Sequence, residues 1–190
     1  KAIVRDAARA LAAPGLEFDA AVESASHVMC RELYRLYPGI PVMAQPVPPY
    51  DARKDWQRFW CINPLDGRRG FGEQNGQFTV NIALCDRGKP IVGVVFVPEA
   101  DPPALYYAVQ GRGPPVKETF DRQGAYVGST PVGCRQYTEG DRGLVVVAPP
   151  DADSPQIDAF LSHYDEPARL WVGSSSTLQL LLVAEGAAHV

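Results

Sequence analysis

Apolar residues recur at helical spacing near the start of the chain. They come at steps of three and four at Val22, Ala25, Met29, Leu33 and Leu36, which predicts an amphipathic helix of about four turns. Pro38-Gly39 is expected to end it. A shorter helix is predicted over residues 1–13, just before Pro14-Gly15. The proline-rich segment 41–55 predicts a loop with a brief strand at its start.

From Trp56 the pattern changes to that of strands. Residues 56–63 predict one strand, and residues 78–99 predict a hairpin whose turn is Asp86-Arg87-Gly88. Residues 104–113 add a strand that ends in glycines. Neighbouring antiparallel strands indicate a meander sheet, and the two helices are expected to cover one of its faces.

Beyond residue 114 strands and helices alternate. The apolar run 143–149 predicts a strand buried on both faces, and Ser154-Pro155 predicts the start of a helix. A second buried strand is predicted over 168–172 and a strongly apolar, buried helix over 174–186. The predicted fold class is therefore α/β, a layered α+β sandwich. Residues 1–113 are expected to hold the helix pair and the antiparallel sheet, and residues 114–190 a truncated α/β layer.

Composition narrows the classes of function. With 190 residues, 46% hydrophobic and 21% charged, the chain is typical of a soluble globular protein. A net charge of −4 argues against general binding to nucleic acid or to anionic membranes. No apolar run approaches the roughly 20 residues that span a bilayer. The four cysteines form no C-x-x-C pair, so we interpret them as buried free thiols. This favours a reducing compartment, the cytoplasm or an organelle interior, over secretion.

Two short motifs have ordinary structural interpretations beside a functional one. The glycines of residues 67–72 match no phosphate-binding loop and are expected to serve turns. The serines at 174–176 are expected to cap a helix, whose N-terminus is also a candidate anion site. The three histidines have no serine, cysteine or carboxylate at a spacing that suggests a catalytic set.

Residues 60–98 carry a longer pattern. Pro64-Leu65-Asp66-Gly67 keeps the centre of the motif Asp-Pro-(Leu/Ile)-Asp-Gly-Thr, and residues 78–84 read Phe-Thr-Val-Asn-Ile-Ala-Leu. In both features the chain closely resembles the inositol monophosphatase superfamily, and within it the 3′(2′),5′-bisphosphate nucleotidases; weaker similarity extends over roughly residues 20–190. The resemblance implies that family's fold. It also implies Mg²⁺-dependent hydrolysis of a phosphate monoester, in which carboxylates hold the metal ions.

Several positions depart from the family's motif. Gln45 stands where the family has a glutamate, Asn63 where it has the first aspartate, and Arg68 where it has the threonine that orients the attacking water. Leu65, whose backbone carbonyl is a family ligand, and Asp66 are retained. The family's upstream acidic stretch aligns near residues 19–22, without its acidic pair. The resemblance therefore implies vestigial metal positions at 45, 63, 65 and 66, and vestigial catalytic positions at Asp66 and Arg68.

We interpret this set as a metal-free site in which the Arg68 guanidinium occupies the vacated cation position. It would pair with Asp66 and with the amide oxygens of Asn63 and Gln45. In the alternative, Arg68 and Arg69 point into solvent and Asp66 is a turn residue.

Three functions remain open on this basis. The first is an inactive phosphatase-like protein with no cofactor, which serves as a structural or accessory subunit of a larger assembly or dimer. The second is an active Mg²⁺-dependent bisphosphate nucleotidase or inositol monophosphatase, with ligands from outside this chain or with Asn63 and Gln45 in place of the acids. The third is a metal-independent binder of phosphorylated ligands. Its candidate phosphate-binding residues are Gly67, Arg68, Arg69, Ser174 and Ser175. The first is the main prediction, without nucleic-acid partners or membrane insertion.

Overall fold

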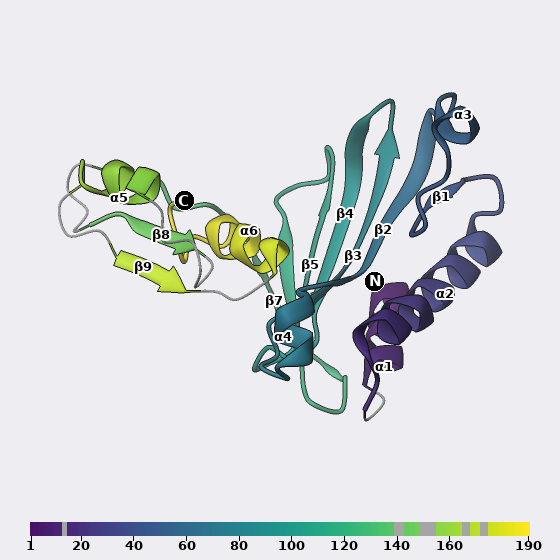
Figure 1. Cartoon of the computed structure of the whole chain (residues 1–190), viewed down its shortest axis with the longest axis horizontal. Coiled ribbons are helices and arrows are strands. Elements are labelled where there is room, and N and C mark those ends of the chain that lie inside the picture. The colour runs from purple at the N-terminus through teal and green to yellow at the C-terminus, as the bar shows by residue number, and fades with distance from the viewer. Residues whose placement is uncertain (13–14, 139–142, 149–154, 165–167, 172–174) are drawn as a thin grey trace.

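The computed structural model describes residues 1–12, 15–138, 143–148, 155–164, 168–171 and 175–190, and these form stacked layers of helices and sheets. Helices α1 and α2 cover one face of a seven-stranded sheet, and α6 lies on the other face, beside a small second sheet (Figure 1). The elements are α1 (Ala2–Leu11), α2 (Phe18–Leu36), β1 (Val42–Met43), α3 (Tyr50–Arg53), β2 (Arg58–Asp66), α4 (Arg68–Gly72), β3 (Thr79–Asp86), β4 (Lys89–Val97), β5 (Ala104–Val109), β6 (Val116–Phe120), β7 (Tyr126–Pro131), β8 (Val145–Ala148), α5 (Pro155–Leu161), β9 (Ala168–Trp171) and α6 (Ser176–Ala184).

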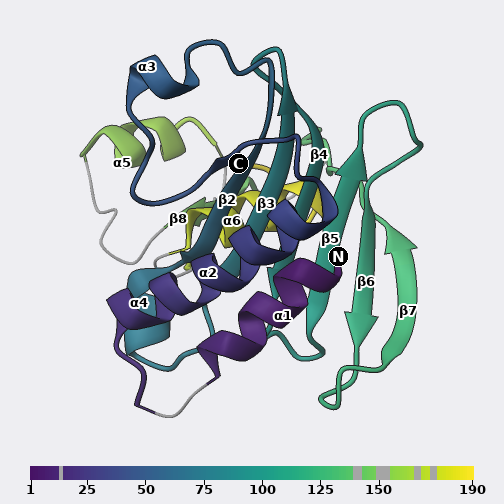
Figure 2. The same cartoon turned by 90° about the vertical axis from the view of Figure 1, so that its right-hand side faces the viewer.

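The two N-terminal helices confirm the helical spacing in the sequence. Met29 and Leu33 of α2 are fully buried, and they pack in one core with residues of α1 and the sheet, such as Val4 and Val80. Figure 2 shows α1 and α2 side by side across this face of the sheet. Leu36, the last residue of the predicted stripe, is 46% exposed because the helix ends there. Burial of this apolar stripe is what attaches the helix pair to the sheet.

The large sheet has its strands in sequence order, from β1 to β7. β1 runs parallel to β2, and every later pair is antiparallel. The predicted hairpin is confirmed: Arg87 and Gly88 both have positive φ, 49° and 76°, as a two-residue turn between twisted strands requires. Two strands, β6 and β7, follow residue 113, so the sheet crosses the expected boundary between the two parts. The division into two parts itself stays a prediction.

The second layer contains the two predicted strands, β8 and β9, which pair in parallel, with α5 beginning at Pro155. The predicted cap residue of α5, Ser154, lies outside the described residues. Leu144, Val146 and Leu161 form a small separate core. Helix α6 was expected to be buried, but none of its side chains is, and Leu180 is 70% exposed. The described chain covers α6 on only part of its circumference.

The remaining differences from the sequence prediction are local. A one-turn helix, α3, forms within the proline-rich segment, and strands β6 and β7 were not predicted. All four cysteines are free, but Cys30, Cys61 and Cys85 are half-buried and Cys134 is exposed, so full burial of the thiols is wrong. Within the described residues, no helix has the length and apolar character needed to span a membrane.

Candidate functional site

The motif lies at the carboxyl end of β2, where the strand carries a bulge. Asn63 pairs with Asn81 of β3, but Asp66 pairs with Thr79, so three steps along β2 match two along β3. The extra residue turns Asp66 onto the same sheet face as Asn63, the face that carries α6. Without the bulge, these two polar side chains would alternate to opposite faces.

Gly67 makes the turn that follows. Its φ of 112° is in the range that favours glycine, and a Cβ there would overlap the carbonyl oxygen of Gln77. The same carbonyl would meet a Cβ at Gly70. The expected role in a turn is therefore confirmed for Gly67, whereas Gly70 and Gly72 lie within helix α4. The turn presses α4 against residues 77–78 and holds Asp66 at the end of the sheet.

The Asp66 carboxylate joins the sheet to the N-terminus of α6. Its Oδ2 accepts hydrogen bonds from Ser175 Oγ at 2.7 Å and from the backbone N–H of Thr177 at 3.0 Å, and Ser176 Oγ lies 3.5 Å away. Ser175 is fully buried and also caps α6, since its Oγ accepts from the N–H of Leu178 at 3.2 Å. The helix dipole stabilises a negative charge at this position.

A row of polar side chains continues from Asp66 along β3. Thr79 is fully buried, and its hydroxyl donates to Asn81 Oδ1 at 3.1 Å. Asn81 Nδ2 is buried, and none of the described residues accepts a hydrogen bond from it. Asn63, directly opposite on β2, is exposed. The sheet face beside α6 is thus polar around Asp66.

Arg68 does not occupy a cation position next to Asp66, so that interpretation is wrong. Its Nη2 lies 3.8 Å from Asp19 Oδ1 at the start of α2, and its guanidinium carbon lies 4.5 Å from the Phe18 ring centroid. The side chains of Arg68 and Asp19 are 71% and 86% exposed. Helix α4 directs Arg68 toward α2, whereas the bulge directs Asp66 toward α6.

The other predicted site residues are placed as follows. Arg69 Nε donates to Glu73 Oε1 at 2.6 Å on the surface of α4. Gln45 is exposed and lies two residues beyond β1, whose last residue, Met43, pairs with Cys61 of β2. Ser174 lies outside the described residues. The structure therefore places positions 63 and 66 together at the end of β2, with Ser175 beside Asp66.

Two contacts of the motif residues were not predicted from the sequence. One is the backbone N–H of Thr177, which no residue type in the sequence marks. The other is Asp19, which reaches Arg68 from α2. The acidic side chain of Asp19 was visible in the stretch aligned at residues 19–22, and its position at a helix start was the signal.

The described residues do not by themselves form a magnesium site. Mg²⁺ prefers several anionic oxygen ligands in an octahedral arrangement. At this end of the sheet the motif offers one carboxylate, Asp66, together with the Leu65 carbonyl and two amide side chains. Among the described residues, no group of three or more histidine, cysteine, aspartate or glutamate side chains is placed to hold a metal ion. A magnesium-dependent reaction here requires further ligands.

Comparison with known proteins identifies the family. The model of the inositol monophosphatase family matches residues 16–190. The chain belongs to the inositol monophosphatase family. It is 35% identical, over 90% of its length, to 3′(2′),5′-bisphosphate nucleotidase CysQ of Salmonella typhimurium, and equally to that of Escherichia coli K12. The chain spans 63% of the length of these relatives.

Solved structures confirm the fold. The crystal structure of CysQ from Bacteroides thetaiotaomicron superposes with a TM-score of 0.72 at 24% identity, covering 98% of this chain and 73% of that one. Inositol monophosphatase from Anabaena gives a TM-score of 0.71 at 22% identity, covering 98% of this chain and 69% of that one. The α/β layered fold and the placement near the bisphosphate nucleotidases are therefore both confirmed.

These relatives overturn the main functional prediction. An inactive phosphatase-like protein without a cofactor was expected, yet relatives at 35% identity over most of the chain are named as nucleotidases. The substitutions at positions 45, 63 and 68 do not outweigh that similarity. The interpretation of the chain as a pseudoenzyme is therefore wrong, and the expected lack of a cofactor is not supported. The expected protein partner stays a prediction.

Proposed function

We propose that this protein is a phosphate-monoester hydrolase of the 3′(2′),5′-bisphosphate nucleotidase type. The observation that carries the proposal is the 35% identity over 90% of the chain with proteins of that name. The geometry supports the same conclusion, because the retained motif residue Asp66 is oriented by a buried serine and by a helix N-terminus. Mg²⁺ is the cofactor that this reaction class implies, and Asp66 is the described carboxylate placed to contribute to its binding.

The chain's own residues do two things in this proposal. Ser175 and the N–H of Thr177 fix the Asp66 carboxylate in one orientation. The bulge and the Gly67 turn hold that carboxylate at the end of the sheet, next to the exposed amide of Asn63. Phosphoryl transfer depends mainly on positioning and on electrostatic stabilisation, so a rigid carboxylate is the contribution that this site offers.

The test is release of phosphate from adenosine 3′,5′-bisphosphate by the full protein across a Mg²⁺ titration, with inositol 1-phosphate as the competing substrate. We expect metal-dependent turnover that prefers the bisphosphate and falls at least a hundredfold in Asp66→Asn. Glu32→Ala, which removes a carboxylate paired with Arg31 and Arg35 on α2, is the control and should keep its activity. A folded protein that releases no phosphate at any Mg²⁺ concentration would refute the proposal.

A further inference from the structure

Helix α6 is attached to the large sheet at both of its ends by polar contacts. At its N-terminus, Ser175 and Thr177 contact Asp66. At its C-terminus, Glu185 Oε2 accepts hydrogen bonds from Tyr106 Oη at 2.9 Å and from Lys117 Nζ at 2.7 Å. We call the group of Tyr106, Lys117 and Glu185 the α6 clamp. It joins parts of the chain that lie 79 and 68 residues apart.

The sheet holds the two donors of the clamp in place. Tyr106 on β5 and Lys117 on β6 are a directly opposed register pair, so their side chains leave the same face side by side. The side chains of Lys117 and Glu185 are only 30% and 23% exposed. Burial alone would lower the pKa of Lys117, but its hydrogen bonds to Glu185 and Tyr106 raise it. Burial raises the pKa of Tyr106, and the hydrogen bond to Glu185 adds to this.

Between its two ends, α6 is poorly packed. A solvent-open pocket of about 350 Å³ lies between the helix and the sheet, with Leu178, Leu181 and Leu182 on the helix side and Val97 and Ala104 on the sheet side. No side chain of α6 is buried. Apolar packing normally fixes a helix on a sheet. Here the apolar side chains of α6 and of the sheet are separated by the open pocket. The position of α6 therefore depends on the polar contacts at its ends.

We propose that the α6 clamp is a positioning device for the site: by holding the C-terminal end of α6, it sets where Ser175 and Thr177 meet Asp66. The nine-residue helix is a rod of about 13 Å, so a shift at one end is transmitted to the other. The kinetic test of this proposal rests on the proposed function, because it measures turnover. A second test measures the placement of the α6 N-terminus by hydrogen exchange and does not depend on activity.

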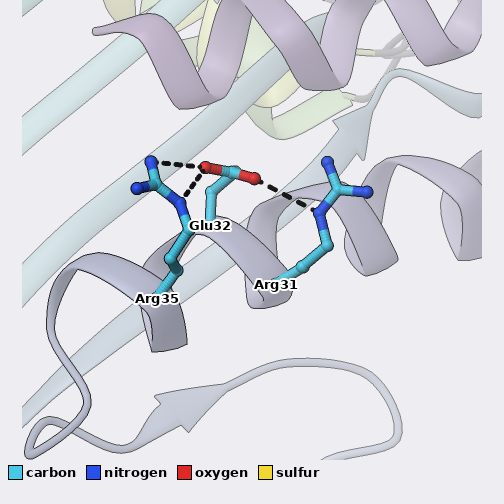
Figure 3. A network of polar contacts seen from close by, with 3 residues as sticks. All are labelled: Arg31, Glu32 and Arg35. Carbon is cyan, nitrogen blue, oxygen red and sulfur yellow. Dashed lines mark hydrogen bonds and ion pairs between the residues drawn. The ribbon is translucent and has the colours of Figure 1, made fainter.

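The first test compares the kinetics of three variants of the full protein with adenosine 3′,5′-bisphosphate as substrate. Glu185→Ala should lower kcat about tenfold and leave KM within about twofold, because Asp66 loses its fixed orientation while substrate contacts remain. Glu185→Gln should recover most of the loss, since its amide oxygen still accepts from Tyr106 and Lys117. The control is Glu32→Ala, which removes a carboxylate with two cationic partners, Arg31 and Arg35, on α2 (Figure 3).

The second test measures hydrogen exchange at the amides of Thr177 and Leu178. Glu185→Ala should raise their exchange rates about tenfold, and Glu32→Ala should not change them. If the wild-type protein shows no turnover, the proposed function fails, and the exchange rates still decide the clamp. If Glu185→Ala does not fold, Lys117→Met removes the other charged partner and takes its place. Exchange rates equal to those of Glu32→Ala would overturn the proposal.

Discussion

Replacement of Ser175 by alanine tests the contact between the motif and α6. The side chain is fully buried and has two roles: it donates to the Asp66 carboxylate at 2.7 Å and caps α6 by accepting from Leu178 N–H at 3.2 Å. Loss of an N-cap costs about 1 kcal/mol. Loss of a hydrogen bond to a charged group costs about 1.5–3 kcal/mol. Because Thr177 N–H still donates to Asp66 at 3.0 Å, we expect a total near the lower end, about 2.5 kcal/mol.

The assay is urea unfolding, supported by thermal unfolding. The dependence of the unfolding free energy on urea concentration should be unchanged, so that a shift of the midpoint reports stability. For a chain of this size, about 2.5 kcal/mol corresponds to a fall in Tm of about 5–10 °C. The matched control is Ser176→Ala, because its hydroxyl is exposed and lies 3.5 Å from Asp66; we expect a change within about 0.5 kcal/mol. If Ser175→Ala were as stable as Ser176→Ala, the Asp66 contact would not attach α6 to the sheet.

Two further predictions concern the motif turn and the far end of α6. Gly67→Ala should destabilise the protein by about 2 kcal/mol or more, because its φ of 112° and the overlap with the Gln77 carbonyl act together. Gly88→Ala, at a φ of 76° in open space, should cost about 1 kcal/mol, and equal costs in urea unfolding would contradict the steric argument. The pKa of Lys117 is raised, so its stabilising contribution is complete below its ordinary value of 10.5 and is lost as the pH rises through the raised value. The fall in Tm above about pH 10 should therefore be shallower in Lys117→Met than in the wild type, and parallel curves would count against this contribution.

The sequence predicted best those elements that depend on neighbouring residues. The stripe that includes Met29 and Leu33 predicted α2, and the turn at Arg87-Gly88 predicted the hairpin. Strands β6 and β7 escaped prediction because most of their side chains stay partly or fully exposed. Without an apolar alternation, nothing local distinguishes such strands from loops.

The site was predictable in its location but not in its contacts. The motif places positions 63 and 66 at the carboxyl end of β2, as its spacing indicates. The partners of Asp66, however, lie 109 and 111 residues further along the chain, and Arg68 turned toward Asp19 instead. Such contacts are set by tertiary packing, which residue spacing does not encode. The functional prediction was wrong because it weighed three substituted positions above a similarity that covers 90% of the chain.

The two roles of Asp66 determine how its variants must be interpreted. The carboxylate belongs to the candidate site, and it is also the anion that holds the N-terminus of α6. Asp66→Asn therefore removes a charge from the site and weakens the attachment of the second layer at the same time. Ser175→Ala weakens the attachment and leaves the carboxylate in place. The two variants can therefore be compared at equal destabilisation. If Asp66→Asn then loses more turnover than Ser175→Ala, the excess loss is attributable to the charge itself.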